Sequence, residues 1–169
     1  MTIKAVTRLF AALGLLLGAA CHPKSKEISS LQRKTAANLV SEAQFAVTMR
    51  KNAQAADLYE KAAALCPDVA EYWVELGACR RQLDQRAAAR KAYETALGVY
   101  RDAYAHDGKE AQPLLEQVFV LALLGRVDDA RKTLAKVREA HGDNVSVRNF
   151  TEQSLDQMLA DPSFKSNAL

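Results

Sequence analysis

The stretch Ala70–Leu97, AEYWVELGACRRQLDQRAAARKAYETAL, decides the fold of this chain. Trp73 stands four places before a small residue, Gly77, and a second small residue, Ala89, stands four places before Tyr93. Two small residues let a pair of helix backbones approach, while the aromatic rings fill the space beside them. The spacing therefore predicts two antiparallel helices that pack closely across a short turn.

The same pattern recurs on both sides of this stretch. In the copy before it, Ala43 takes the place of Gly77 and Tyr59 that of Tyr93, and in the copy after it Val118 takes the place of Gly77. The order of bulky and small residues resembles the tetratricopeptide repeat, a helix hairpin with a period of about 34 residues, over positions 36–142. The middle copy is longer than this period by seven positions, which predicts that its second helix runs on for about two more turns.

The resemblance implies an all-α fold, an α-solenoid of three tetratricopeptide-like helix hairpins plus a C-terminal capping helix. The expected helical domain covers residues 30–160, and the residues that follow form a frayed tail. We expect the parts at the following positions: repeats at about 36–69, 70–110 and 111–142, the cap helix at about 145–160, and the tail at 161–169.

The first twenty residues have the layout of a signal peptide. Lys4 and Arg8 form a basic start, and Leu9–Leu17 is an apolar run that is shorter than the roughly 20 residues of a spanning helix. A cleaved signal over residues 1–20 is therefore expected. Their removal lowers the formal net charge from +3 to +1 and leaves no basic block, so we expect no nucleic-acid partner.

The junction of this segment, LGAAC at Leu17–Cys21, resembles the lipobox of bacterial lipoproteins. The resemblance implies that Cys21 carries a lipid, that residues 21–29 are a tether, and that the protein is anchored in the bacterial envelope. Because His22 rather than an acidic residue follows, it favours the outer membrane, facing the periplasm. An ordinary secretory signal with a cysteine nearby is the alternative.

No stretch of the sequence carries a pattern of catalytic chemistry. The sequence has no HExxH pair, no GxSxG motif, no phosphate-cradling glycine loop and no Cys/His cluster with zinc spacing. We therefore expect no enzyme, no cofactor and no metal. Cys66 and Cys79 should lie roughly 13 Å apart along antiparallel helices, which is too far for a disulfide.

In the family that the sequence resembles, the first helices of successive hairpins line a concave groove. Carried over by position, the expected groove residues are Val40, Gln44, Val47, Val74, Ala78, Arg81, Gln82, Leu115 and Phe119. Leu115 and Phe119 can face either a ligand or the cap helix. Arg81 can hold a carboxylate or backbone carbonyls of a bound segment, or it can pair with an acid such as Glu71.

Two function classes follow from these expectations. The first is a scaffold or assembly factor that holds a segment of another envelope protein in its groove, while the lipid attaches it to the membrane. The second is a structural or self-associating helical module, whose groove is filled by its own cap or by another copy of the chain.

Overall fold

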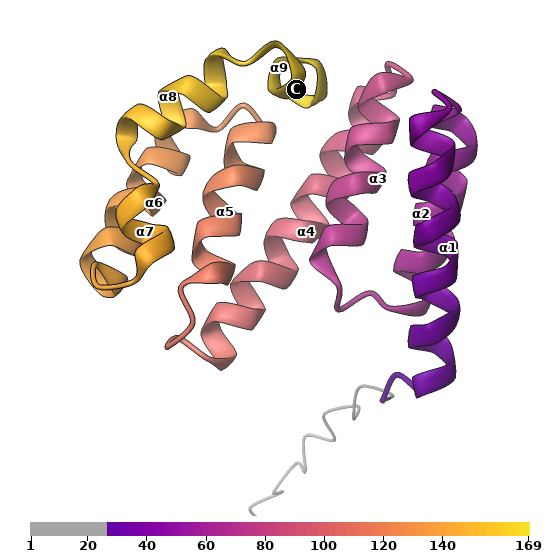
Figure 1. The fold of residues 1–169 in the computed structure, drawn as a ribbon, viewed down its shortest axis with the longest axis horizontal. Helices are drawn as coiled ribbons and strands as arrows, with labels where there is room; N and C mark the ends of the chain where they lie inside the picture. The colour runs from indigo at the N-terminus through magenta and orange to yellow at the C-terminus, as the bar shows by residue number, and fades with distance from the viewer. Residues whose placement is uncertain (1–26) are drawn as a thin grey trace, which may run out of the picture.

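Three helix hairpins stack side by side in the computed structural model, which describes residues 27–169 (Figure 1). The expected signal segment, Cys21 and most of the tether lie outside the described residues. The first helices of the hairpins are α1 Ser30–Thr48, α3 Ala70–Gln82 and α5 Gln112–Leu123. The second helices are α2 Asn52–Leu65, α4 Arg86–His106 and α6 Val127–His141. Because the described part is helical without strands, the all-α solenoid class is confirmed.

The same turn ends the first helix of every hairpin. Arg50, Asp84 and Gly125 have φ angles of 56°, 57° and 71°, in the left-handed region, and they occupy equivalent positions in the three repeats. The amide after each of them donates to a carbonyl five residues back, as Lys51 does to Ala46. This is the hydrogen bond of a Schellman motif, which satisfies carbonyls left free at a helix end. The repeat is therefore present in the backbone as well as in the packing.

A large apolar core fills the space from the middle hairpin to the C-terminus. Tyr93, Val118 and Leu134 are fully buried in it, and so are Val147 and Leu155 from the cap. As the sequence predicts, α4 continues to His106, and its last turns bury Tyr100. Two smaller clusters, which consist mainly of alanines, fill the first hairpin and its contact with α3 and α4.

The cap differs from the single helix expected over 145–160. The structure has α7 Val145–Asn149 and α8 Glu152–Ala160. Phe150 adopts an extended backbone between them, and Thr151 starts α8 with a capping box that pairs it with Ser154. Arg131 of α6 then ties α8 to the solenoid through ion pairs, with Glu152 at 2.8 Å and Asp156 at 2.5 Å.

The two ends of the described chain are also more ordered than expected. The tail forms a further helix, α9 Pro162–Asn167, because the Asp161 side chain accepts hydrogen bonds from the Ser163 and Phe164 amides and caps it. At the other end, Ile28 of the expected tether packs against the cluster that contains Cys66. Both ends therefore belong to the fold.

Candidate binding groove

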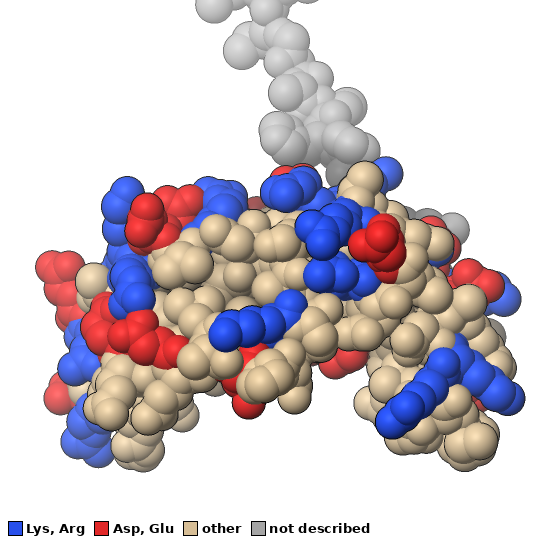
Figure 2. Space-filling model, turned by 90° about the horizontal axis from the view of Figure 1, so that it is seen from above, with Lys and Arg blue, Asp and Glu red and all other residues tan. Residues whose placement is uncertain are grey.

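One broad face of the molecule is hollowed. Seen from above in Figure 2, the ends of the row project beyond its middle on the side that α1, α3 and α5 form in Figure 1. These are the first helices of the three hairpins, so the concave surface lies where the resemblance places it. We call this face the groove. One end of it, between the C-terminal ends of α3 and α5, is occupied.

The C-terminal segment Pro162–Leu169 lies at one end of the groove, beside the C-terminal ends of α3 and α5 (Figure 1). Arg81 Nε donates to the Ala168 carbonyl at 2.7 Å, and the Tyr93 hydroxyl donates to the Asn167 carbonyl at 2.8 Å. The Leu169 amide donates to the Leu123 carbonyl at 2.9 Å. These bonds reach main-chain atoms of the segment, so they hold its backbone and are insensitive to its side chains.

Two side-chain contacts complete the attachment of this segment. The Gln82 amide donates to Ser166 Oγ at 3.1 Å and to Asn167 Oδ1 at 2.8 Å, and it lies 3.3 Å from the Ser166 carbonyl. Phe164 is buried, and its ring meets Phe119 of α5 edge to face, with the ring centroids 5.6 Å apart. Phe164 is therefore the main apolar anchor of the segment, and Ala168 and Leu169, which are partly buried, also pack against the large apolar cluster.

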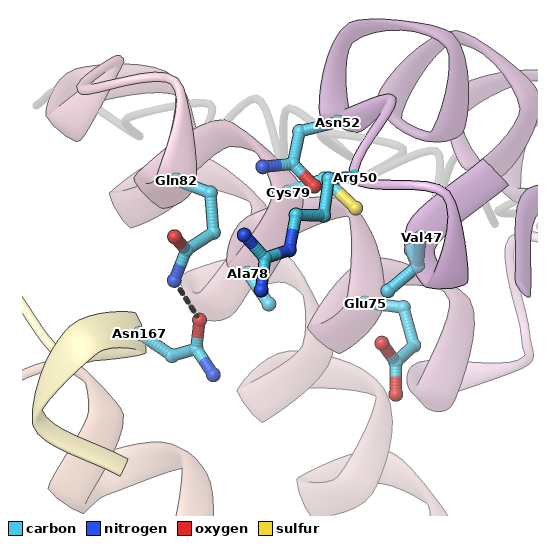
Figure 3. A pocket seen from close by; sticks show the side chains of 8 residues that line it. All are labelled: Val47, Arg50, Asn52, Glu75, Ala78, Cys79, Gln82 and Asn167. Carbon is cyan, nitrogen blue, oxygen red and sulfur yellow. Dashed lines mark hydrogen bonds between the residues drawn. The ribbon is translucent and has the colours of Figure 1, made fainter. Parts of the chain in front are cut away.

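An open pocket of about 480 Å³ adjoins this segment on the side of the first hairpin. In Figure 3, Arg50 and Asn52 reach over it from the α1–α2 turn, Ala78 belongs to α3, and the hydrogen-bonded pair Gln82–Asn167 closes one side. Val47, Glu75 and Cys79 complete the lining. The pocket thus combines apolar walls with groups of both charges.

Three polar side chains of this pocket take no part in holding the fold together. Arg50, Asn52 and Glu75 make no side-chain hydrogen bond or ion pair within residues 27–169. The neighbouring walls partly desolvate the Glu75 carboxyl and raise its pKa above the usual value, although part of the side chain remains at the surface. These groups are available to a ligand.

The structure distributes the nine groove residues among four environments, three of which hold seven of the residues. Gln44, Val47 and Ala78 stand along the first part of the groove, with Val47 39% exposed. Val40 and Val74 are partly buried against the core clusters. Arg81 and Gln82 bind the C-terminal segment.

The last two predicted groove residues face the C-terminal elements. Leu115 and Phe119 line a pocket with Phe150 and Met158 of the cap, and Phe119 also meets Phe164. Arg81 holds a backbone carbonyl, one of the options that the sequence left open, while Glu71 instead accepts a hydrogen bond from the Tyr100 hydroxyl at 3.2 Å.

Sequence reasoning missed Arg50, Asn52 and Glu75 as pocket residues. Arg50 lies in the turn after α1 and Asn52 is the first residue of α2, whereas the family pattern places groove positions within the first helices only. Arg50 has a signal that could have found it, because it stands where the third hairpin has Gly125. A bulky residue at a left-handed position costs about 1–2 kcal/mol, so it needs a compensating reason to be there.

The described residues hold no metal-ion cluster, no disulfide and no membrane-spanning helix. No group of three or more His, Cys, Asp and Glu side chains among residues 27–169 is arranged to hold a metal ion. Cys66 and Cys79 are buried free thiols, as expected, and burial raises the pKa of both. Within the same residues, every helix is too short or too polar to cross a bilayer.

Comparison with known proteins finds a partial sequence match and similar solved structures. Residues 87–153, from α4 to the start of α8, match the family model of the Tetratricopeptide repeat. No curated protein matches the sequence significantly.

Similar solved structures include tetratricopeptide domains and a chaperone, all of low sequence identity. The first TPR of Spaghetti (RPAP3) bound to an HSP90 peptide is 17% identical, with a TM-score of 0.47, over 76% of this chain and 96% of that chain. The Arabidopsis OM64 TPR domain is 15% identical, with a TM-score of 0.45, over 76% and 97%. The Yersinia enterocolitica type III secretion chaperone SycD, in complex with a peptide of the translocator YopD, is 20% identical, with a TM-score of 0.47, over 81% and 97%.

Proposed function

We propose that this protein is a non-enzymatic interaction scaffold or assembly factor, a tetratricopeptide-repeat lipoprotein of the bacterial envelope. In this proposal it binds a segment of another envelope protein in its groove. The observation that carries the proposal is the open pocket beside α3, where Arg50, Asn52 and Glu75 have no partner within the described chain. Polar side chains that the fold does not use, next to apolar walls, suit an extended or helical segment of another protein.

A photo-crosslinking residue at Val47 tests this binding site. Val47 lines the pocket, and Val145 on α7, which is 60% exposed and outside the pocket, is the matched control. In intact envelopes, crosslinks from position 47 should map by mass spectrometry to one segment of one protein. They should disappear when Glu75→Lys is added at an unchanged melting temperature. Identical products from positions 47 and 145 would show that the pocket is not the binding site.

The envelope part of the proposal depends on Cys21, which lies outside the described residues. The basic start, the short apolar run and LGAAC support a lipid on this cysteine, with residues 1–20 removed and the outer membrane as destination. In bacterial cells that express the full chain, Cys21→Ser should move the protein from the membrane fraction to the soluble fraction. A variant that still sediments with membranes would contradict the lipid anchor.

A self-associating module is the second candidate, and one observation favours it. Phe45 and Met49 are 67% and 54% exposed on α1, and residues four apart share one helix face. A second copy could cover them. Sedimentation of the Phe45→Ser chain distinguishes the two candidates. Loss of a dimer with unchanged crosslinks at Val47 would show that self-association and partner binding use different surfaces.

A further inference from the structure

The way in which the groove holds Pro162–Leu169 indicates what else it can hold. Carbonyls of three successive residues, 166 to 168, accept hydrogen bonds from Gln82, Tyr93 and Arg81. Main-chain recognition of this kind is common to any segment that presents free carbonyls. The only side chain of the segment that is buried is Phe164. The groove therefore binds one buried aromatic side chain and the backbone that follows it, with Ala168 and Leu169 partly buried at the end of the segment.

We infer that Pro162–Leu169 is a displaceable internal ligand, and that the partner segment binds by replacing it. The inference rests on the proposed function and specifies the chemistry of the partner. That segment carries an aromatic side chain in the place of Phe164, followed two to four residues later by carbonyls that accept hydrogen bonds from Gln82, Tyr93 and Arg81. A partner must therefore bind the groove more strongly than the tethered C-terminal segment does.

The attachment of the segment is local, which makes exchange feasible. Helix α9 has six residues, fewer than a helix needs to be stable alone, so it depends on its contacts with the groove. The extended backbone at Asp161 separates it from α8. Replacement therefore requires release of one aromatic anchor, the partly buried Ala168 and Leu169, and a few hydrogen bonds. The cap helices α7 and α8 keep their own buried residues, Val147 and Leu155.

The surroundings of the segment leave room for a longer occupant. Asn167 borders the open pocket with Arg50 and Glu75, and Phe164 borders a second pocket with Met158 and Gln157 of α8. A partner that takes the place of the segment can extend along α3 into the pocket of the first hairpin. A tethered ligand has an effective concentration on the order of millimolar at its binding site. A partner from another chain therefore needs these additional contacts to compete with the tethered segment.

A labelled peptide with the sequence of residues 161–169, capped at both ends, tests the inference with the full chain. Phe164→Ala removes the internal anchor but leaves the groove intact, so this variant should bind the peptide about tenfold or more tightly than the unaltered chain. Lys165→Ala is the matched control, because Lys165 is exposed on the same helix. It should bind like the unaltered chain. A peptide with alanine in place of phenylalanine should not bind the Phe164→Ala chain.

A second variant covers the possibility that Phe164→Ala disturbs the core. Ser166→Ala with Asn167→Ala removes the side-chain contacts with Gln82, and also the hydrogen bond from the Ser166 hydroxyl to the Ser163 carbonyl, but leaves Phe164 in place. It should increase peptide binding by a smaller factor. Equal binding by all chains, or no binding by any of them, would overturn the inference. Concentration-dependent dimers that exchange their C-terminal segments would also overturn it, since the occupant would then be a second copy. None of these results alters the crosslinks expected at Val47, so the proposed function is judged separately.

Discussion

At the level of single residues, each hairpin matches a small side chain on its first helix with a larger one on its second. Gly77 lies against the ring of Tyr93 in the middle hairpin. The corresponding residues of the first hairpin are Ala43 and Tyr59, and those of the third are Val118 and Leu134, all buried. Where the first position grows to valine, the second shrinks to leucine. The smaller second residue of the third hairpin leaves space for the larger first one, as close packing favours.

The fit at Gly77 gives a prediction with an internal control. A Cβ atom on Gly77 would lie 2.5 Å from Tyr93 Cδ1, whereas one on Gly98 would meet nothing within 4 Å. Gly77→Ala should lose about 1–3 kcal/mol through overpacking, which outweighs or cancels the gain of about 1 kcal/mol in helix propensity. Gly98→Ala should keep that gain. Urea unfolding measures the difference, and equal stabilisation by both changes would show that the Tyr93 ring can move aside.

At the level of helices, the repeats were predictable because their signals are local and periodic. The spacing of small and aromatic residues located the hairpins, and Tyr100 on the stripe of α4 revealed the longer helix. The break within the cap was missed because the apolar pattern runs through it. Val147, Phe150 and Leu155 fit one helical face, and only the capping box at Thr151 indicates a new start.

The last helix, α9, was not predicted from the sequence for a different reason. The sequence predicts a frayed tail from Asp161 onward, but Asp161–Pro162 begins α9, with Asp161 as N-cap and Pro162 in the first turn. Its hydrogen bonds lower the pKa of the Asp161 carboxyl below its usual value, which agrees with its role as a cap. The contact of this helix with Arg81, 87 residues away in the sequence, depends on tertiary packing that no local pattern encodes. The sequence left open whether Arg81 holds a carboxylate, backbone carbonyls or an acid such as Glu71, and it did not identify Ala168 as its partner.

At the level of the whole molecule, the apolar core is unevenly distributed. The first hairpin buries mostly alanines, such as Ala43, Ala46 and Ala55, and alanine removes little apolar surface from water. The larger cluster runs from α3 to α9 and contains leucines, valines and aromatic residues. Because solenoid stability is a sum over repeats and their interfaces, the hairpin α1–α2 should open at a lower free energy than the rest.

Two cavity-forming substitutions test this asymmetry by hydrogen exchange. Tyr59→Ala in α2 and Leu134→Ala in α6 each remove a buried side chain, at a cost of about 3–5 and 2–5 kcal/mol respectively. Tyr59→Ala should abolish amide protection in α1 and α2 while α5 and α6 keep theirs, because the larger cluster does not need the first hairpin. Leu134→Ala should lower protection throughout, because α3, on which the first hairpin packs, belongs to the cluster that contains Leu134. Equal losses in all helices for both variants would mean that the solenoid unfolds as one cooperative unit.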